Sequence, residues 1–191
     1  MKLSKVKTIK SSYLALLLVL VFSFSACNSK GQNDSKQKTS LTNIHEAAFM
    51  GNIEAIKAHV DAKSDLNEKD AYGSSPLAIA TIFNKPEVAR ALIEGGADIN
   101  IKSADGSTPL HSAAFFCRKD IVAMLLNKGA DKTARNNYGS TALESISAPF
   151  EDVKPFYDQI SRDLGPLGLK LDYQQVQETR PVIVEMIKNS Q

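Results

Sequence analysis

One spacing constrains this chain more than any other feature. Gly73, Gly106 and Gly139 follow one another at intervals of 33 residues. The same interval links the segments SSPLAIA, STPLHSAA and STALESI, and it also links SDLN, ADIN and ADKT. A partial earlier copy, TNIHEAAFMGNIEAIKAHVDAKSDLN, begins at Thr42. A fixed period of this length indicates a stacked array in which each unit buries its apolar face against its neighbours.

Each unit has the residues that two short helices need. Thr108 is placed to cap the first helix, and Pro109 occupies its first turn, where a missing N–H costs nothing. Thr141 and Glu144 have the spacing of a capping box. Small residues let neighbouring first helices approach, and apolar residues at helical spacing give the second helix its buried stripe. These positions in the third unit are Ala113 and Ala114, then Ile121, Val122, Leu125 and Leu126.

The second helix of each unit is expected to end in the left-handed conformation. Gly96 and Gly129 suit that position, since glycine adopts positive φ without steric cost. Lys63 stands there in the first unit, which is expected to cost about 1 kcal/mol if the conformation is kept.

The segments TPLHSAA at Thr108–Ala114 and LLNKGAD at Leu125–Asp131 resemble the ankyrin repeat. The resemblance covers about residues 42–148. It implies an all-α solenoid of about four helix-turn-helix repeats with short β-turn tips, at about 42–72, 73–105 and 106–138, with a fourth starting at 139–148. It also implies that His45 and His111 are structural histidines that tie the start of a first helix to neighbouring backbone.

After Ala148 the period fails, and two interpretations of residues 149–191 stay open. In the first, an insertion separates the two helices of the last repeat. It holds a helix near Phe150–Leu164, a turn at residues 165–168 and a short helix capped by Asp172, and the second helix then starts near Pro181. In the second, the second helix is Glu151–Asp163 and the rest is an appended cap. A terminal unit must differ either way, because its outer face meets water.

The first 26 residues have the pattern of a secretory signal, with four lysines before an apolar run that is shorter than a bilayer-spanning helix. The ending Phe24-Ser25-Ala26-Cys27 resembles the bacterial lipobox, which implies cleavage and lipidation at Cys27. The alternative is an ordinary cleaved signal with a chance cysteine. Residues 27–41 are polar and are expected to form a flexible tether. By resemblance, the expected location is the bacterial envelope, preferably its outer membrane.

The charge of the chain argues against nucleic acid as a partner. The formal net charge is +2, and it becomes −2 without the lysine-rich first 26 residues, whereas a nucleic-acid footprint needs clustered lysine and arginine. We expect a monomer that needs no cofactor or metal.

An array of this family is expected to bind a partner protein through its turn tips and its first-helix faces. Tip positions by resemblance include Tyr72, Ser74, Asp105, Ser107, Asn137 and Tyr138, and helix positions include Ile82, Phe83, Phe115 and Phe116. Together with Phe49 and Met50, the helix positions form a row of six apolar residues. Either this row packs into the core under the C-terminal segment, or it is an exposed stripe that marks a partner site.

The remaining candidate residues have simpler interpretations. His59 has no ligand partner at metal spacing and is expected at the surface. Cys117 replaces a glycine common between the two helices and is expected to be a half-buried thiol without an intrachain disulfide. Carboxylates in the C-terminal segment leave an enzyme as an alternative, without a nucleophile motif, metal-ligand set or phosphate loop to support it. A passive envelope element is a third possibility. The carboxylates are Glu151, Asp152, Asp158, Asp163 and Asp172.

Overall fold

The computed structural model describes residues 42–190, which form α-helices and one short 3-10 turn, with no strand among them. The first three helix pairs are α1 (Ile44–Met50) and α2 (Ile53–Asp61), α3 (Pro76–Ile82) and α4 (Pro86–Glu94), and α5 (Pro109–Phe115) and α6 (Lys119–Asn127). They are followed by α7 (Ala142–Ser147), α8 (Phe150–Leu164), η2 (Gly165–Leu167) and α9 (Tyr173–Asn189).

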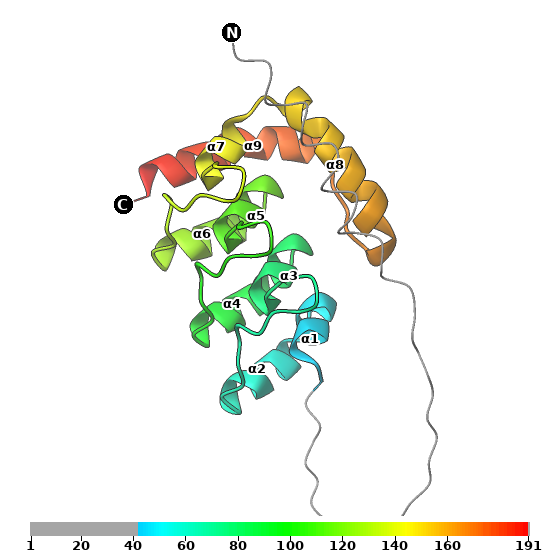
Figure 1. The fold of residues 1–191 in the computed structure, drawn as a ribbon, viewed down its shortest axis with the longest axis vertical. Helices are drawn as coiled ribbons and strands as arrows, with labels where there is room; N and C mark the ends of the chain where they lie inside the picture. The colour runs from blue at the N-terminus through cyan, green and yellow to red at the C-terminus, as the bar shows by residue number, and fades with distance from the viewer. Residues whose placement is uncertain (1–41, 191) are drawn as a thin grey trace, which may run out of the picture. The chain divides into compact units, whose positions relative to one another are not determined.

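The helix pairs stack in register. The first helices α1, α3, α5 and α7 pack against one another in sequence, and the second helices α2, α4, α6 and α9 form a parallel row beside them (Figure 1). Tight turns join the two helices of each of the first three pairs, and longer loops carry the chain from one pair to the next. This is the all-α repeat solenoid that the sequence predicts.

Polar side chains cap the amino-terminal ends of several helices. The side chains of Asn43, Asn52 and Ser75 accept hydrogen bonds from the first-turn N–H groups of α1, α2 and α3. At α7 the expected capping box forms, because Thr141 Oγ1 accepts from Glu144 N at 3.1 Å and Glu144 Oε2 accepts from Thr141 N at 2.8 Å.

Left-handed residues end the second helices as predicted. Gly96 and Gly129 have φ values of 94° and 80°, and Lys63 adopts 53° at the same position in the first repeat. A second left-handed position lies between the helices of each pair, at Gly51, Asn84 and Cys117. Cys117 therefore occupies the glycine-like turn position, with φ of 55°.

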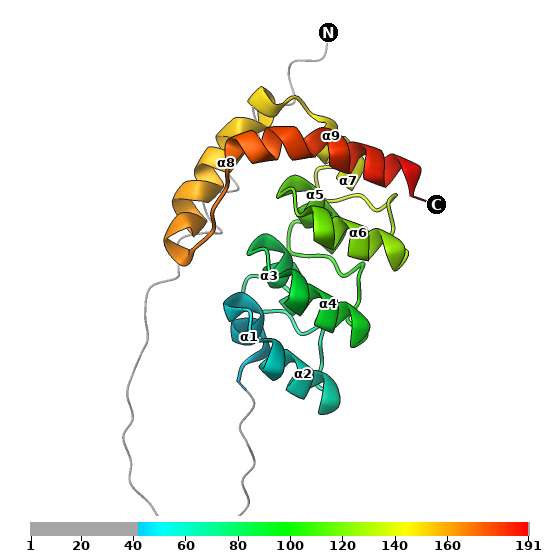
Figure 2. The same cartoon turned by 180° about the vertical axis from the view of Figure 1, so that it is seen from behind.

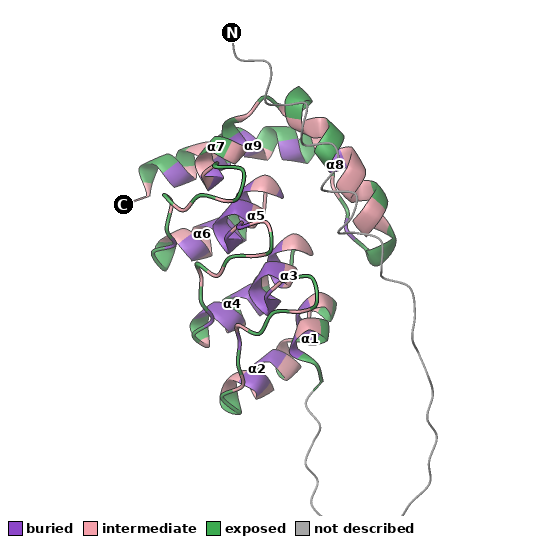
Figure 3. Cartoon of the chain, viewed as in Figure 1, coloured by how far each residue is buried: buried purple, intermediate pink, exposed green. Residues whose placement is uncertain are grey.

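The core runs between the two rows of helices. Leu77, Leu110 and most alanines of the first helices are fully buried, as are Ile56, Leu92 and Leu125 of the second helices. Leu126, expected in the buried stripe, is half-buried. Figure 3 shows this buried layer passing through α3, α4, α5 and α6, whereas α8 is largely half-buried or exposed. The small alanine side chains let the first helices approach closely, as the sequence predicts.

The fourth repeat combines α7 with the C-terminal half of α9. Helix α9 packs on α7 and on α6, as α6 packs on α5 and on α4. Ile183 and Ile187 are buried in α9 where Val88 and Leu92 are buried in α4. The insertion interpretation therefore describes the fold, and the interpretation that makes Glu151–Asp163 the second helix is wrong.

The sequence predicts the start of the last helix wrongly. Asp172 caps α9 as expected, by accepting from the N–H groups of Gln174 and Gln175, but the helix continues without a break to Asn189. Pro181, expected at a helix start, lies inside it. A proline removes the donor to the carbonyl four residues earlier, and that residue, Gln177, is exposed, so water can satisfy its carbonyl.

Helix α8 coincides with the predicted helix near Phe150–Leu164, and η2 and Gly168, with φ of 95°, form the predicted turn. In both views α8 lies on the side of the first helices, away from the second helices (Figures 1 and 2). Its one buried residue is Tyr157, which touches the end of α5.

Candidate partner-binding surface

The six apolar residues at the ends of α1, α3 and α5, here called the apolar row, are not equally buried. Met50 is 67% exposed, and Phe116 is 8% exposed. The other four, Phe49, Ile82, Phe83 and Phe115, are half-buried. Burial thus increases along the row from the first repeat to the third, so neither of the two expectations describes the whole row.

The insertion covers the third-repeat end of the row. The Tyr157 ring stacks on Phe115 with centroids 4.6 Å apart and an interplanar angle of 25°. Its hydroxyl donates to the Phe115 carbonyl at 2.5 Å. The Phe115 ring also meets the Phe116 ring edge-on at 5.3 Å. Phe115 and Phe116 therefore belong to a packed aromatic cluster, and the prediction that they are open to a partner does not fit this geometry.

Basic side chains link the third and fourth repeats to the first helix of the repeat before each of them. Arg118 donates from Nη2 to the Ile82 carbonyl at the end of α3, at 3.0 Å. Arg180 is the equivalent residue of the fourth repeat, but it reaches Phe115 indirectly. Its Nη1 donates to the Tyr157 hydroxyl at 3.2 Å, and that hydroxyl donates to the Phe115 carbonyl. Arg180 Nη2 also donates to the Ala148 carbonyl. Tyr157 thus fits between two repeats as a relay.

In the first two repeats the apolar row has no such cover from Tyr157. Phe49 and Phe83 meet edge-to-face with centroids 4.7 Å apart. Lys85 extends from the start of α4 over Gly51, the residue that follows Met50. Exposed methionine, half-buried aromatic rings and a lysine therefore lie together at the ends of α1 and α3.

Two of the predicted tip residues are exposed tyrosines. Tyr72 is 38% exposed and Tyr138 is 48% exposed. The backbone N–H of Tyr72 donates to Asp70 Oδ1 at 2.9 Å, and that of Tyr138 donates to Asn136 Oδ1 at 3.1 Å. These side-chain acceptors fix the turns, so both rings are presented from defined backbone positions.

The other predicted tip residues serve the tips themselves. The Asp105 carboxylate accepts from the Ser107 hydroxyl at 2.9 Å and from the Ser107 N–H at 3.1 Å. Asn137 joins neighbouring tips, since its N–H donates to the Asp105 carbonyl at 2.9 Å and its side-chain amide donates to the Ala104 carbonyl at 3.2 Å. The Ser74 N–H donates to Asp70 Oδ1 at 2.8 Å. These residues therefore form hydrogen bonds mainly with other residues of the repeats.

Comparison with known protein families agrees with this architecture. A family model described as ankyrin repeats, in three copies, matches residues 44–136. Residues 44–136 are ankyrin repeats. Such repeats are generally protein–protein interaction modules. No curated protein matches the chain.

Two histidines of the ankyrin repeats have the structural role that the sequence predicts. His111 donates from Nε2 to the Ser140 carbonyl of the next repeat at 3.0 Å, and its Nδ1 accepts from the Thr108 N–H at 3.2 Å. His45 likewise donates from Nε2 to the Glu68 carbonyl at 2.9 Å. Burial lowers the pKa of His111, so it is neutral at pH 7.

The expectation for His59 is wrong. This residue is 8% exposed, not a surface residue. Its Nε2 donates to the Thr42 carbonyl at 2.6 Å, and its Nδ1 accepts from the Ser64 hydroxyl at 3.1 Å. His59 joins the residues before α1 to the turn after α2, a role that has no counterpart in the other repeats and therefore no periodic signal.

Burial shifts the pKa values of the titratable side chains around the covered end of the row. Burial raises the pKa of the Cys117 thiol to about 11 and that of Tyr157 to about 12. A thiol that is protonated at neutral pH is a poor nucleophile, so the environment of Cys117 suits a packing role and not a reactive one. Burial also lowers the pKa of Arg118, whose guanidinium has no carboxylate within salt-bridge distance among the described residues.

The C-terminal carboxylates are dispersed. Asp158 accepts from Lys154 and from the Tyr173 hydroxyl, Asp163 accepts from Gln159, and Asp172 caps α9. Glu151 and Asp152 are exposed in the first turn of α8. Within residues 42–190 no three of the potential metal-binding side chains come together. The acidic residues therefore form no common site in this part of the chain.

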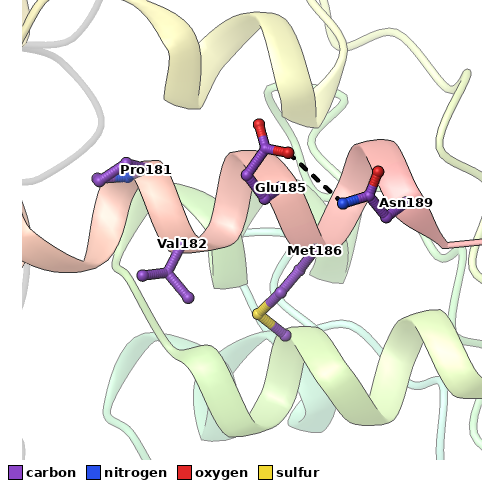
Figure 4. Close-up of a pocket in the computed structure, with 5 residues that line it drawn as sticks. All are labelled: Pro181, Val182, Glu185, Met186 and Asn189. Carbon is purple, nitrogen blue, oxygen red and sulfur yellow. Dashed lines mark hydrogen bonds between the residues drawn. The ribbon is translucent and has the colours of Figure 1, made fainter.

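A shallow pocket lies along α9, on the terminal repeat. Figure 4 shows its lining residues on a single helix, with Val182 and Met186 on one side and Glu185 hydrogen-bonded to Asn189 at 3.5 Å. Its lining is mainly apolar and brings together no acid–base or nucleophilic pair. No helix in the described region, 42–190, has the length and hydrophobicity to cross a bilayer. Cys27 lies outside that region.

Three residues that shape this surface were not predicted from the sequence. Tyr157 and Arg180 form the relay to Phe115, and Lys85 lies beside the exposed part of the row. Lys85 and Arg118 differ by one period of 33, so the repeat alignment contains the signal for a basic column. Tyr157 belongs to the insertion and has no such signal.

Proposed function

We propose that this protein is a non-catalytic interaction module, tethered by lipid on Cys27 to a bacterial envelope membrane, preferably the outer membrane. It binds a partner protein through the tips and first-helix faces of its ankyrin repeats. The observation that carries the proposal is the apolar surface at the ends of α1 and α3, where Met50 is 67% exposed beside the Phe49–Phe83 pair. Apolar surface of this kind on a folded domain commonly marks a partner site.

The exposed tyrosines at the tips support the same conclusion. Tyrosine rings often carry much of the binding energy of an interface, because they bury a large area at low entropic cost. Asx-type turns hold the backbone at Tyr72 and Tyr138, so a partner would meet rings that project from fixed backbone positions.

The lipid tether is supported by the amino-terminal sequence. Phe24-Ser25-Ala26-Cys27 follows an apolar run, and the polar residues that separate Cys27 from Thr42 could span at most roughly 50 Å when extended. Lipid on Cys27 would hold the ankyrin repeats close to a membrane surface and raise their effective concentration toward partners there.

Co-purification tests the binding proposal. The full chain is isolated from detergent-solubilised envelopes beside a Tyr72→Ser, Tyr138→Ser variant and a control with Arg90→Ser on the exposed face of α4. We expect a partner protein that is retained by the wild type and the control and is lost from the tip variant. Equal recovery from all three would contradict the proposal.

A separate experiment tests the tether. Cys27→Ser should abolish incorporation of a labelled fatty acid and release the protein from the membrane fraction, whereas Cys117→Ser, the matched control, should change neither. A wild-type protein that incorporates no label, or a Cys27→Ser protein that is labelled as strongly as the wild type, would show that the lipid proposal is wrong.

A further inference from the structure

Helix α8 shows that the apolar row accepts an aromatic side chain from an amphipathic helix. It is amphipathic, and it places one aromatic side chain, Tyr157, on the row at Phe115. It is also acidic, with Glu151, Asp152, Asp158 and Asp163 against Lys154 and Arg162. The third repeat is thus already occupied by an acidic amphipathic helix that belongs to the same chain.

The basic side chains beside the row lack acidic partners. Lys85 and Arg118 stand at the N-cap positions of α4 and α6, where no side-chain cap forms. A cation is disfavoured there, because the amino end of a helix carries partial positive charge. Neither residue forms a salt bridge within the described part of the chain. The Nε of Arg118 is buried and Nη2 already donates to the Ile82 carbonyl, so Lys85 is the group that an incoming carboxylate would meet at this edge of the row.

Resting on the function proposed above, we propose that the apolar row of the first two repeats docks an acidic amphipathic helix of the partner protein, as the third repeat holds α8. An aromatic or large aliphatic side chain of the partner packs on Phe83 and Met50. A carboxylate one turn away pairs with Lys85, which lies over Gly51 next to Met50. Tyr157 on Phe115 shows that an aromatic side chain can pack at the end of a first helix, although Met50 and Phe83 lie one residue beyond the positions equivalent to Phe115.

One acidic residue of the array sets the direction of the partner helix. Glu46 is exposed on α1, one turn before Met50, on the side of the row away from Lys85 along that helix. Its charge repels an acidic partner at that end. The carboxylates of the partner therefore lie toward the turn between the helices, and its neutral end lies over the start of α1.

A peptide with the sequence of residues 149–168, which comprise α8 and its turn, is the probe. It is labelled with a fluorophore and titrated with the full chain in detergent, and its anisotropy is followed. We expect saturable binding with a Kd below about 1 mM. A peptide carrying Tyr157→Ala should bind at least tenfold more weakly, and 0.5 M salt should weaken the binding of the original peptide because it screens the charge pairing.

Variants of the full chain place the site. Lys85→Glu and Met50→Ser should each weaken binding about tenfold, and Glu46→Gln should strengthen it. Lys57→Glu, the same charge reversal on the exposed face of α2, should have no effect. If circular dichroism shows that the Lys85→Glu protein is unfolded, Lys85→Gln replaces it. This variant should lose less affinity for the peptide.

The outcomes separate this inference from the function on which it rests. No saturable binding, or binding that Lys85→Glu and Lys57→Glu change equally, overturns the docking mode. If the partner of the co-purification experiment is still retained, the interaction function stands and only the helical, acidic nature of the partner segment is rejected. Binding that Met50→Ser leaves unchanged places the peptide at Phe115, by exchange with α8, and also overturns the inference.

Discussion

Tyr157→Phe is the most informative single change in the fold. Tyr157 is fully buried, and its ring stacks on Phe115 while its hydroxyl connects Arg180 to the Phe115 carbonyl. Phenylalanine keeps the ring and removes only the hydroxyl. The substitution therefore isolates the hydrogen-bond relay from the aromatic packing.

The expected cost follows from the groups that are left without partners. Arg180 is 5% exposed and would keep only the Ala148 carbonyl as a hydrogen-bond acceptor, and the Phe115 carbonyl would lose its donor. Hydrogen bonds to charged groups contribute about 1.5–3 kcal/mol each, and a buried unsatisfied group costs a similar amount. We expect a loss of about 2–3 kcal/mol in the free energy of unfolding, or roughly 4–12 °C in Tm for a domain of this size.

Urea unfolding followed by circular dichroism measures this loss, with Tyr173→Phe as the matched control. The Tyr173 hydroxyl donates to Asp158 at 2.9 Å in a half-buried setting, so its removal should cost about 0.5–1.5 kcal/mol. An unchanged m-value would confirm that the two variants unfold the same structure. If Tyr157→Phe costs no more than Tyr173→Phe, the relay does not stabilise the attachment of α8, and this reasoning is refuted.

Three further predictions concern the repeats. Lys63→Gly relieves the left-handed strain at φ of 53° and should raise the free energy of unfolding by about 0.5–1 kcal/mol, whereas Ala62→Gly, in the right-handed region, should lower it. Burial lowers the pKa of His111 below 6.5, so the unfolded state binds its proton more readily than the folded state does. The free energy of unfolding should therefore fall as the pH drops from 6.5 through the folded pKa. His111→Gln should flatten this pH dependence, which is measured as the midpoint of urea unfolding at each pH. With its pKa raised to about 11, Cys117 in a Cys27→Ser protein should react with iodoacetamide at pH 8 roughly 100-fold more slowly than after unfolding. Rates within threefold of each other would contradict the last prediction.

The regular part of the fold could be predicted because each local signal occurs several times. Gly96 and Gly129 end their helices at the same point, and the repetition identifies Lys63 as a strained residue although lysine alone gives no such signal. The cap at Asp172 and the turn at residues 165–168 could be predicted for a different reason, since their chemistry is local. Local chemistry and repetition can both be recognised in the sequence without knowledge of how the helices pack.

Packing across the insertion could not be predicted. Pro181 resembles Pro86, which starts α4, but the helix that Asp172 starts continues through Pro181, and the residue whose carbonyl loses its donor, Gln177, is exposed to water. The partner of Tyr157 depends on how far the insertion folds back over α5, and nothing in its sequence repeats. His59 is a similar case, because its partners at Thr42 and Ser64 belong to the first repeat alone.

The position of the apolar row could be predicted from the sequence, but its exposure to solvent could not. Spacing alone brings Met50, Phe83 and Phe116 into one row, and the structure keeps them there. Whether each one faces a helix or solvent depends on α8, which covers Phe115 and leaves Met50 67% exposed. The sequence therefore predicts where the surface lies but not how much of it is covered.

Site-specific photo-crosslinking in living cells tests the central claim most directly. A photoreactive amino acid is placed at Met50, at the open end of the apolar row, and in a parallel strain at Arg90, on the exposed face of α4. The account predicts one discrete crosslinked partner from position 50, joined through an acidic amphipathic segment, and none from position 90. The same crosslinks from both positions, or none from position 50 while the protein is folded and in place, would contradict it.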